Sequence, residues 1–569
     1  MHDLVIRGGT IVDGSGGPAR SGDVAIDGDR VTQAEGSAGA ARREIDADGL
    51  LVTPGWVDIH THYDGQVTWD PYLTPSSWHG VTSVVMGNCG VGFAPARPDR
   101  HEWLIGLMEG VEDIPGTALA EGIRWEWETF PEYLDAVERM PRALDVGAQV
   151  PHGAVRAYVM GERGAKNEPP TPEDIEQMAA IVREGIQAGA LGFTTSRTLL
   201  HRAVDGEPVP GTFASEDEVL GIGRVLGELG RGVFEMASDL APEDRELAWV
   251  HQLARETGRP VTFACLQNDV NPDQWQRLLR SAEEAAAEGS TVVPQVAVRP
   301  TGILMGLEST VHPFKQHRAY MEIADKPLAE RVAILRTPEF RERILNEKVD
   351  FSDPMSAFVM ASFHKLFPLG DPPDYEPTAD QSVAAIAKRE GREPLEVVYD
   401  MLLRQDGREL LYFPILNYAQ FDFEPIHEML THPQTVLGLS DGGAHCGLIC
   451  DASAPTYLLT HWVRDRKRGE RVPLEWAVQA QTRRTAELYG LGDRGLLAPG
   501  MLADVNLIDF DALRVAPPEM TYDLPSNAGR LVQHADGYRA TLKRGELVFQ
   551  DGEPSGALPG RLLRGPQPA

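Results

Sequence analysis

The sequence predicts an α/β protein: a (β/α)8 TIM-like barrel with a small β-sandwich domain formed by both termini. Short apolar runs alternate with amphipathic helical stretches through the middle of the chain, whereas both ends contain short strands and tight turns. The length of 569 residues suits one barrel with insertions. We expect the β domain to comprise residues 1–53 and 498–569, and the barrel to comprise residues 54–497.

The two ends of the chain have the pattern of an all-β domain. Residues 4–6, 10–12 and 23–26 are rich in β-branched side chains, and Asp-Gly and Gly-Gly pairs separate them. Residues 504–509 and 547–549 repeat this pattern near the carboxyl terminus. Each end alone is too short to bury a good core, so we expect the two ends to form one domain.

Eight candidate strands and the helices between them define the predicted barrel. The strands are residues 57–62, 81–90, 145–158, 190–196, 232–238, 260–267, 291–299 and 436–440. Helical periodicity is found in residues 172–188, 216–229, 242–257 and 272–288. Two insertions are expected, near residues 98–139 and 301–430. The second is expected to contain helices at residues 326–346, 354–366 and 381–404 and to cover the site.

Composition excludes several classes of partner. The chain has 53 Lys and Arg against 85 Asp and Glu, a formal charge of −32, which argues against nonspecific binding to nucleic acids or anionic membranes. Four cysteines in this length do not form a disulfide framework, and neither a signal peptide nor a long apolar span is evident. We therefore expect a cytoplasmic protein that acts on a small molecule. The sequence leaves open whether the protein forms a homo-oligomer.

The pattern His60-Thr61-His62 is the sharpest local signal for chemistry. Side chains on a strand alternate, so both histidines point to the same face, and the carboxyl end of a barrel strand is where such enzymes bind substrate. Neutral imidazole is a common metal ligand. Asp441 follows the eighth candidate strand, where a carboxylate could bind a metal and transfer a proton. Exposed strand histidines and an Asx turn at Asp441 are the structural alternatives.

Four separated blocks of the sequence resemble a known family. They are VIRGGTIVDGSG, VTPGWVDIHTHYDGQ, GVTSVVMGNCGVGFAP and RGLLAPGMLADVNLIDFD. In this order they are similar to the amidohydrolase superfamily and, more narrowly, to the N-acyl-D-amino-acid deacylase (D-aminoacylase) group. The resemblance covers nearly the whole chain. It implies a (β/α)8 barrel with a composite β-sandwich, a divalent metal that is usually zinc, and hydrolysis of an amide by a metal-activated hydroxide.

The resemblance also implies a set of metal ligands. His60 and His62 match the two ligands of the first strand, and Cys89 matches the metal-binding cysteine of the deacylase group. Asp441 matches the aspartate that binds metal and acts as general base and acid. Glu235 stands where the group has a histidine, and the sixth candidate strand has no histidine. This departure favours one ion, Zn²⁺, over two. The alternative for Cys89 is a small buried apolar residue.

Substrate recognition departs from the group's pattern as well. The deacylases hold the substrate carboxylate with an arginine downstream of the aspartate, and no arginine follows Asp441 at that place. Arg299, at the end of the seventh candidate strand, is expected to take over this role. His152 and Arg197 are placed at barrel loops that face the site. His445 is expected to orient the base or to donate to an oxyanion. A purely structural role is the alternative for each.

The function expected from these residues is metal-dependent hydrolysis of an amide bond. The substrate class implied is an N-acyl (D-)amino acid or a related N-acyl compound, with Asp441 as general base and acid. A deaminase, cyclic amidase or decarboxylase built on the same barrel is one alternative. A metal-depleted barrel that serves as a scaffold or binding protein is another, and the missing histidines of the fifth and sixth strands favour it.

Overall fold

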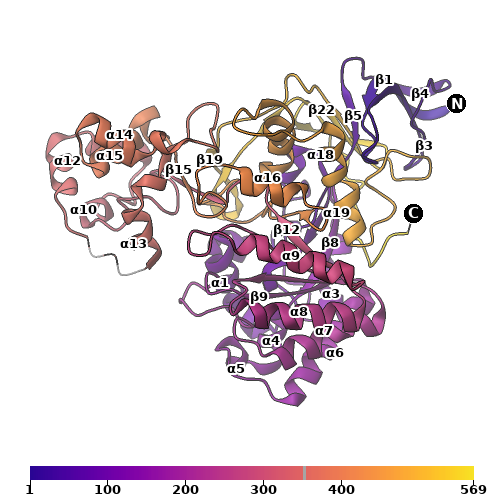
Figure 1. Ribbon diagram of the computed structural model, residues 1–569, viewed down its shortest axis with the longest axis horizontal. Helices are drawn as coiled ribbons and strands as arrows, with labels where there is room; N and C mark the ends of the chain where they lie inside the picture. The colour runs from indigo at the N-terminus through magenta and orange to yellow at the C-terminus, as the bar shows by residue number, and fades with distance from the viewer. Residues whose placement is uncertain (350, 352–353, 569) are drawn as a thin grey trace.

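The computed structural model describes residues 1–349, 351 and 354–568, and its centre is a curled parallel sheet of eight strands (Figure 1). In chain order these strands are β6 Trp56–Asp58, β7 Val81–Met86, β8 Asp145–Pro151, β9 Gly192–Arg197, β10 Val233–Ser238, β11 Val261–Ala264, β12 Val292–Val296 and β16 Val436–Leu437. Neighbours in the sheet follow chain order, and β16 pairs with β12. An isolated parallel bridge between Thr61 and Gly442 connects the segments that follow the two outer strands.

The strands and helices around this sheet follow from apolar patterning. Every residue of β7 and β8 is buried, as expected for parallel strands that are covered on both faces. The helices that alternate with the strands are α4 His152–Met160, α5 Glu162–Ala165, α6 Pro172–Ala188, α7 Glu216–Leu229, α8 Glu243–Thr257 and α9 Gln274–Ala287. They lie together on one flank of the sheet in Figure 1. The bounds of α6 and α7 are those expected from the sequence.

Several elements differ from the sequence-based expectation, because the strands β6, β11 and β12 and the helix α13 Pro354–Ala361 are shorter than expected and three further elements end for a clear local reason. The expected strand over residues 145–158 is wrong beyond Pro151, because helix α4 begins at His152. The expected strand over residues 81–90 ends at Met86, because Gly87 takes a φ of 84° that breaks the extended backbone. The expected helix over residues 381–404 is two helices, α14 Val383–Glu390 and α15 Pro394–Leu402, because Gly391 ends the first in a left-handed conformation.

Both ends of the chain contribute to one mixed sheet of nine strands. Its strands are β1 His2–Ile11, β2 Arg20–Asp27, β3 Arg30–Gln33, β4 Ala41–Asp46, β5 Leu51–Pro54, β17 Val505–Ile508, β22 Tyr538–Lys543, β23 Glu546–Gln550 and β24 Glu553–Pro554. β5 pairs with β17 and so joins the two ends. Smaller two-stranded sheets pair β18 Arg514–Val515 with β21 Ala535–Asp536, and β19 Glu519–Leu524 with β20 Ala528–Val532. Both termini lie on the same side of the molecule (Figure 1).

The first insertion contributes three helices that pack around the curled sheet, and α3 lies against α6. They are α1 His101–Glu112, α2 Gly116–Gly122 and α3 Phe130–Arg139. Their apolar side chains belong to the same buried cluster as those of the barrel strands, so this insertion packs directly on the barrel. Trp127 is buried within it and donates from its indole nitrogen to the carbonyl of Phe93, 2.7 Å away.

The second insertion forms a lobe that projects from the barrel (Figure 1). Its elements are β13 Gly302–Met305, α10 Arg318–Met321, α11 Leu328–Leu335, α12 Pro338–Leu345, α13 Pro354–Ala361, β14 Phe367–Pro368, α14, α15 and β15 Leu411–Pro414. Helix α16 Glu424–Thr431 follows the lobe and packs into the core around the curled sheet. Side chains between Ile303 and Phe413 form a buried cluster separate from the barrel core. The helix expected over residues 326–346 is split into α11 and α12. Residues 350, 352 and 353 of this insertion lie outside the described residues.

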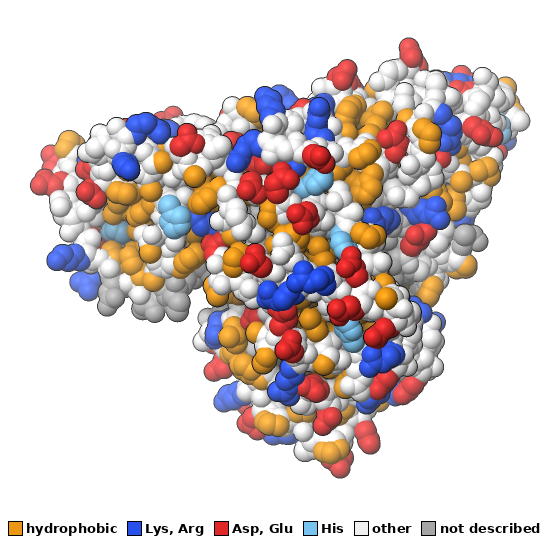
Figure 2. Space-filling view, in the orientation of Figure 1, with side chains coloured by type: hydrophobic (Ala, Val, Ile, Leu, Met, Phe, Trp, Pro, Cys, Tyr) orange, Lys and Arg blue, Asp and Glu red, His pale blue; other side chains and the backbone are white. Residues whose placement is uncertain are grey.

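The chain returns to the barrel through α17 Ala454–Tyr457, a π-helical segment Leu458–Asp465, α18 Leu474–Ala480 and α19 Arg483–Leu488. Acidic and basic side chains are interspersed on the face drawn in Figure 2, and the net charge of −32 is not gathered in one patch there. Among the described helices, none has the length and apolar character needed to cross a bilayer.

Candidate metal centre

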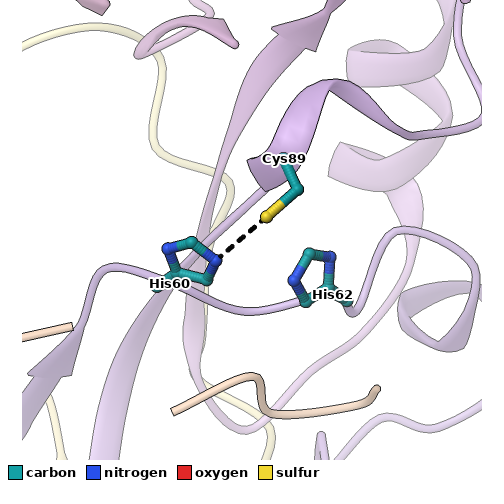
Figure 3. A group of neighbouring side chains, drawn as sticks. All are labelled: His60, His62 and Cys89. Carbon is teal, nitrogen blue, oxygen red and sulfur yellow. Dashed lines mark hydrogen bonds between the residues drawn. The ribbon is translucent and has the colours of Figure 1, made fainter. Parts of the chain in front are cut away.

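His60 and His62 lie directly after β6 and point into one cluster with Cys89 (Figure 3). One ligand atom from each of the three side chains lies within 4.8 Å of the others, and all three residues are buried. The backbone N–H of His62 donates to the carbonyl of Gly442 at 2.8 Å, which fixes this segment against the eighth strand. The alternation of side chains between the two faces of a strand therefore continues beyond the last residue of β6, so that His60 and His62 point to the same side.

His60 has an orienting partner that sequence reasoning missed. Its Nδ1 lies 2.9 Å from Oε1 of Gln295 on β12, a contact that fixes Nδ1 as the protonated nitrogen. Nε2 then carries the free lone pair, and it lies 3.4 Å from Sγ of Cys89 and 3.3 Å from Oδ1 of Asp441. His60 thus presents a metal-binding nitrogen to the other candidate ligands.

Cys89 reaches the cluster from a tight turn after β7. The turn spans Asn88–Gly90, and Cys89 itself has a positive φ of 57°. Gly90 is required here, because a Cβ would lie 2.6 Å from the backbone nitrogen of Ser196. The backbone N–H of Cys89 donates to Oε2 of Glu235 at 3.0 Å, so Glu235 stabilises the turn that carries the thiol.

Asp441 closes the cluster from the end of the eighth strand. Its carboxylate Oδ1 lies 3.3 Å from Nε2 of His60 and 3.6 Å from Nε2 of His62. Its backbone N–H donates to the carbonyl of His60 at 3.1 Å, and the neighbouring Ser440 donates to Asp58 at 2.5 Å. The first and last strands therefore hold the aspartate and both histidines in one place.

Two further carboxylates border this cluster. Glu235, predicted as a ligand, has one buried oxygen, Oε1, without a hydrogen-bond partner among the described residues. Glu112, which sequence reasoning missed, ends helix α1 and places Oε1 3.4 Å from Nδ1 of His62. Nothing in the local sequence signals Glu112, because it is the last residue of an ordinary amphipathic helix far from the histidine pair.

Burial and neighbouring charges raise the pKa values of most acidic groups in this cluster, and burial lowers that of a histidine. Burial raises the pKa of the Cys89 thiol well above its usual range, and the carboxylates of Glu235, Glu112 and Asp441 raise it further. Burial also raises the pKa of Glu235, to about 7. It lowers the pKa of His62 to about 4, so this imidazole is neutral near pH 7. A neutral imidazole can bind a metal.

Asp441 behaves differently from the other buried acids. Burial acts to raise its pKa, but the hydrogen bond with His62 and the charges of His60 and His445 outweigh burial and lower the pKa below its usual range. The carboxylate is therefore ionised at neutral pH and can accept a proton or bind a cation.

The donor set fits a divalent metal. Two imidazoles, a thiol and a carboxylate are the ligands that zinc prefers in proteins. Oε1 of Glu235, Oε1 of Glu112 and Nδ1 of His62 are buried without hydrogen-bond partners among the described residues. Buried carboxylates of this kind are costly without a compensating positive charge. A cation bound by His60, His62, Cys89 and Asp441 would supply that charge.

The remaining predicted site residues differ in their placement. His445 borders the cluster, with Nε2 3.9 Å from Oδ2 of Asp441. Both ring nitrogens of His152 have partners, Thr195 at 2.8 Å and Glu218 at 3.1 Å. Arg197 is paired with Glu246 through two hydrogen bonds of 2.6 and 2.8 Å and donates to the carbonyl of Ala214. The polar atoms of His152 and Arg197 are thus used within the fold.

Arg299 lies behind the lining of a pocket beside Asp441. Asp441, Cys450 and Asp451 all line this pocket, whereas Arg299 itself does not. Arg299 donates to Oδ1 of Asp451 at 3.0 Å and to the carbonyl of Cys450 at 2.6 Å. Its Nη1 is buried and has no hydrogen-bond partner among the described residues. One donor nitrogen of Arg299 therefore stays available for an acceptor group.

Gln267 follows β11, the sixth strand of the sheet, which contains no histidine. Its Oε1 accepts from the backbone N–H of Ala419 at 3.0 Å, and its Nε2 donates to Gln420 at 2.5 Å. The side chain thus binds the segment after β15 and is used in packing the second insertion against the barrel.

Comparison with known proteins identifies the family of the chain. The model of the Amidohydrolase family matches residues 43–549. Among curated relatives, the chain is 28% identical to N-acyl-D-glutamate deacylase and 26% identical to D-aminoacylase, both from Alcaligenes xylosoxydans xylosoxydans. These alignments cover 99% of this chain and 96% and 97% of the relatives.

Solved structures agree on the fold. A D-aminoacylase structure described by its binuclear metal centre has a TM-score of 0.66 at 24% identity, with 99% of this chain and 100% of that chain covered. N-acyl-D-glutamate deacylase from Bordetella bronchiseptica, solved with zinc and a phosphonate inhibitor, has a TM-score of 0.64 at 24% identity, with 99% of each chain covered. Because the family model spans most of the sequence, the chain belongs to the Amidohydrolase family.

Proposed function

We propose that this protein is a metal-dependent deacylase that hydrolyses the amide bond of N-acyl-D-amino acids or related N-acyl compounds. The observation that carries the proposal is the convergence of His60, His62, Cys89 and Asp441 at the carboxyl side of the curled sheet. The curated relatives with near-complete coverage are named as deacylases of N-acyl-D-glutamate and N-acyl-D-aspartate and as a D-aminoacylase, which supports this substrate class.

The cofactor in this proposal is a single Zn²⁺ held by His60, His62, Cys89 and Asp441, with Glu235 as an additional ligand. When bound, such a cation polarises the amide carbonyl and lowers the pKa of bound water towards about 7. The mixed nitrogen, sulfur and oxygen donors support zinc. Glu235 stands where the resemblance places a histidine, and the sixth strand has no histidine, which supports one ion rather than two.

Asp441 moves the proton in the proposed reaction. Its carboxylate is ionised and its Oδ1 faces the metal-binding nitrogens of both histidines, so it can take a proton from the attacking water. The protonated carboxyl then returns that proton to the leaving nitrogen. His445, 3.9 Å from Asp441, is placed to hold the aspartate or to donate to the carbonyl oxygen as negative charge develops.

Arg299 is the proposed anchor for the substrate carboxylate. Its Nη1 is buried without a hydrogen-bond partner among the described residues, and the guanidinium carbon lies 4.1 Å from the ring centre of Tyr375. Asp441 lines a pocket together with Asp451 and Cys450, and the latter two residues hold the guanidinium. A substrate with its amide at Asp441 would reach Arg299 with its carboxylate only past Asp451 and Cys450. His152 and Arg197 have no role in this proposal.

The organisation we propose for the chain follows the same family. Residues 1–53 and 498–569 form a composite β-sandwich domain, and residues 54–497 form a (β/α)8 barrel with insertions near 98–139 and 301–430. The nine-stranded sheet and the curled parallel sheet support this division. We place the protein in the cytoplasm, because its four cysteines are unpaired.

The proposal is tested by a hydrolysis screen and by one substitution. Purified protein with added Zn²⁺ is assayed on N-acyl-D-amino acids, N-acyl-L-amino acids and cyclic amides, and Asp441→Asn is assayed beside it. We expect hydrolysis of an N-acyl-D-amino acid, and a loss of kcat of about 10²–10⁴-fold in Asp441→Asn with most of the metal retained. Asp48→Asn, an exposed site in the amino-terminal sheet, is the control.

Two results would overturn the proposed function. If Asp441→Asn had the kcat of the wild type, Asp441 would not be the general base and acid. A non-catalytic binding protein would be favoured by two results together. The purified protein would contain far less than one metal ion per chain, with occupancy restored by neither Zn²⁺ nor Mn²⁺, and the screen would show no turnover.

A further inference from the structure

Helix α1 of the first insertion brings a buried carboxylate to the edge of the metal centre. Glu112 is the last residue of this helix, and its side chain is 2% exposed. The helix ends there because Asp113 takes a left-handed conformation with a φ of 50°. An acidic side chain that is almost fully buried is unusual without a charged or hydrogen-bonding partner.

The end of α1 is fastened to the segment that follows Asp441. The backbone N–H of His445 donates to the carbonyl of Glu112, and that of Cys446 donates to the carbonyl of Asp113 at 3.2 Å. Oδ2 of Asp113 accepts from the backbone N–H of Gly447 at 2.8 Å. These bonds fix the position of the Glu112 carboxylate relative to the eighth strand.

The two oxygens of Glu112 face two different histidines. Oε1 lies 3.4 Å from Nδ1 of His62, and Oε2 lies 3.7 Å from Nε2 of His445. Neither Nδ1 of His62 nor Oε1 of Glu112 has another hydrogen-bond partner among the described residues. One ring nitrogen of His62 faces His60 and the other points away from it (Figure 3).

His60 shows how an acceptor at one ring nitrogen orients the other ring nitrogen. Its Nδ1 is held by Gln295 and its Nε2 faces Asp441 at 3.3 Å. His62 repeats this arrangement, with Nδ1 facing Glu112 and Nε2 facing Asp441 at 3.6 Å. Histidines that bind metals commonly donate their second nitrogen to a carboxylate or carbonyl, which fixes the tautomer and strengthens the ligand.

We propose that Glu112 is a positioning residue for the metal centre: it accepts a hydrogen bond from Nδ1 of His62 and so directs Nε2 of that histidine to the cation. Its second oxygen holds His445 beside Asp441. The inference rests on the proposed metal-dependent function. It makes the first insertion part of the metal centre, because the carboxylate comes from α1 and from no strand of the sheet.

The test measures metal affinity directly. Apo protein is titrated with Zn²⁺ in competition with a chromophoric chelator, for wild type, Glu112→Ala, Glu112→Gln and the control Glu102→Ala, an exposed residue in the first turn of the same helix. We expect Glu112→Ala to weaken Zn²⁺ binding by about 10–100-fold. Glu112→Gln keeps an acceptor oxygen without the charge, so we expect a smaller loss of about threefold or more. Glu102→Ala is expected to match wild type.

A second readout separates positioning from structural support. In protein with ¹⁵N-labelled histidine, the His62 signals of the wild type are expected to show a protonated Nδ1, and those of Glu112→Ala to show a mixture of tautomers. A folded Glu112→Ala with wild-type Zn²⁺ affinity and an unchanged His62 tautomer would overturn the inference. If that variant does not fold, wild-type affinity and an unchanged tautomer in Glu112→Gln overturn it instead.

The outcome for Glu112 is distinguishable from the outcome for the proposed function. Weakened Zn²⁺ binding in the Glu112 variants supports the inference even where the screen finds no N-acyl substrate. Unchanged Zn²⁺ binding overturns it even where the wild type hydrolyses N-acyl-D-amino acids.

Discussion

At the scale of single residues, the proposed metal centre differs from the set of ligands that the resemblance implies. Glu235 stands where a histidine is expected and accepts from the backbone of Cys89, whereas Gln267, after the sixth strand, binds residues 419 and 420. In the proposed centre, Cys89 would therefore carry more of the metal binding than it would beside two further histidines.

Substituting Cys89 is expected to weaken the metal centre. Cys89→Ser replaces the thiolate by a hydroxyl, a poorer zinc ligand, and we expect Zn²⁺ affinity to fall by at least about tenfold. Cys265→Ser is the matched control, because Cys265 is also buried but its Sγ faces Met429 at 3.8 Å. Zn²⁺ titration of both apo variants checks this. Equal affinity in the two variants would show that Cys89 is not a ligand.

Arg299 is expected to decide between charged and neutral substrates. Arg299→Lys keeps the charge that pairs with Asp451 but loses the fork geometry that leaves Nη1 for a ligand. We expect KM for an N-acyl-amino acid to rise about tenfold or more with little change in kcat, and KM for the corresponding N-acyl amide, which lacks the carboxylate, to change little. A rise in KM of the same size for both substrates would contradict the carboxylate contact.

At the scale of elements, a buried carboxylate of one helix joins it to a neighbouring helix. Glu218 in α7 is buried and accepts from His152 at 3.1 Å and from Arg156 at 2.8 Å, both residues of α4. Burial acts to raise the pKa of Glu218, but the contacts with His152 and Arg156 outweigh it and lower the pKa to about 2. The packing of α4 on α7 is thereby linked to the ionisation of one carboxylate.

This pKa predicts a pH dependence of stability. Because the folded-state pKa of about 2 is below the usual glutamate value of 4.5, the charged form of Glu218 stabilises the fold above about pH 4.5. That contribution, on the order of 3 kcal/mol, is lost as the pH falls from about 4.5 towards 2. Chemical unfolding at pH 6 and pH 3.5 measures the first part of this loss, about 1.4 kcal/mol.

Variants of Glu218 check the same prediction. Glu218→Gln is expected to lower the free energy of unfolding at pH 6 by about 3–5 kcal/mol and to flatten its pH dependence below pH 5, because it leaves Arg156 without its carboxylate. Asp217→Asn, one residue away and exposed, is expected to change little. A pH profile in Glu218→Gln identical to that of the wild type would contradict the assignment.

At the scale of the whole molecule, one buried ion cluster joins the barrel to the nine-stranded sheet. Asp145, the first residue of β8, lies 2.9 Å from Nζ of Lys543 in β22 and 2.7 Å from Nη1 of Arg494. Lys543 also pairs with Asp504 at 2.7 Å. Burial acts to raise the pKa of Asp145, but the surrounding cations outweigh it and lower the pKa. Both sheets share this cluster.

Removing the charge of Asp145 is expected to destabilise both sheets together. Asp145→Asn leaves buried cations without their partner, so we expect the free energy of unfolding to fall by about 3–5 kcal/mol. Asp135→Asn is the control, because its pair with Arg564 is largely exposed and contributes at most about 1 kcal/mol. Thermal unfolding followed by circular dichroism checks both. A wild-type melting temperature in Asp145→Asn would show that the cluster does not join the sheets.

The apolar pattern of the sequence predicts the order of the parallel strands and most of the helices, and the sequence also marks candidate ligands. Eight apolar runs in order predict the parallel strands, and the pair His60 and His62 predicts the metal ligands of the first strand, because alternation along a strand is a local property. The expected strand beyond Pro151 and the unbroken helix over residues 381–404 were wrong, because a proline and a glycine end elements that the apolar pattern continues.

Only the tertiary structure decided which side chains orient those ligands. Gln295 is 235 residues from His60, and Glu112 comes from an insertion helix. Gln295 reaches the centre because the strands of a curled parallel sheet bring their carboxyl ends together, whatever the distance along the chain. Glu112 reaches it because the end of α1 is hydrogen-bonded to the segment that follows Asp441. No local pattern marks a residue for such a contact. The sequence therefore predicts the ligands that lie on one strand, whereas the partners that fix their orientation depend on how distant segments pack.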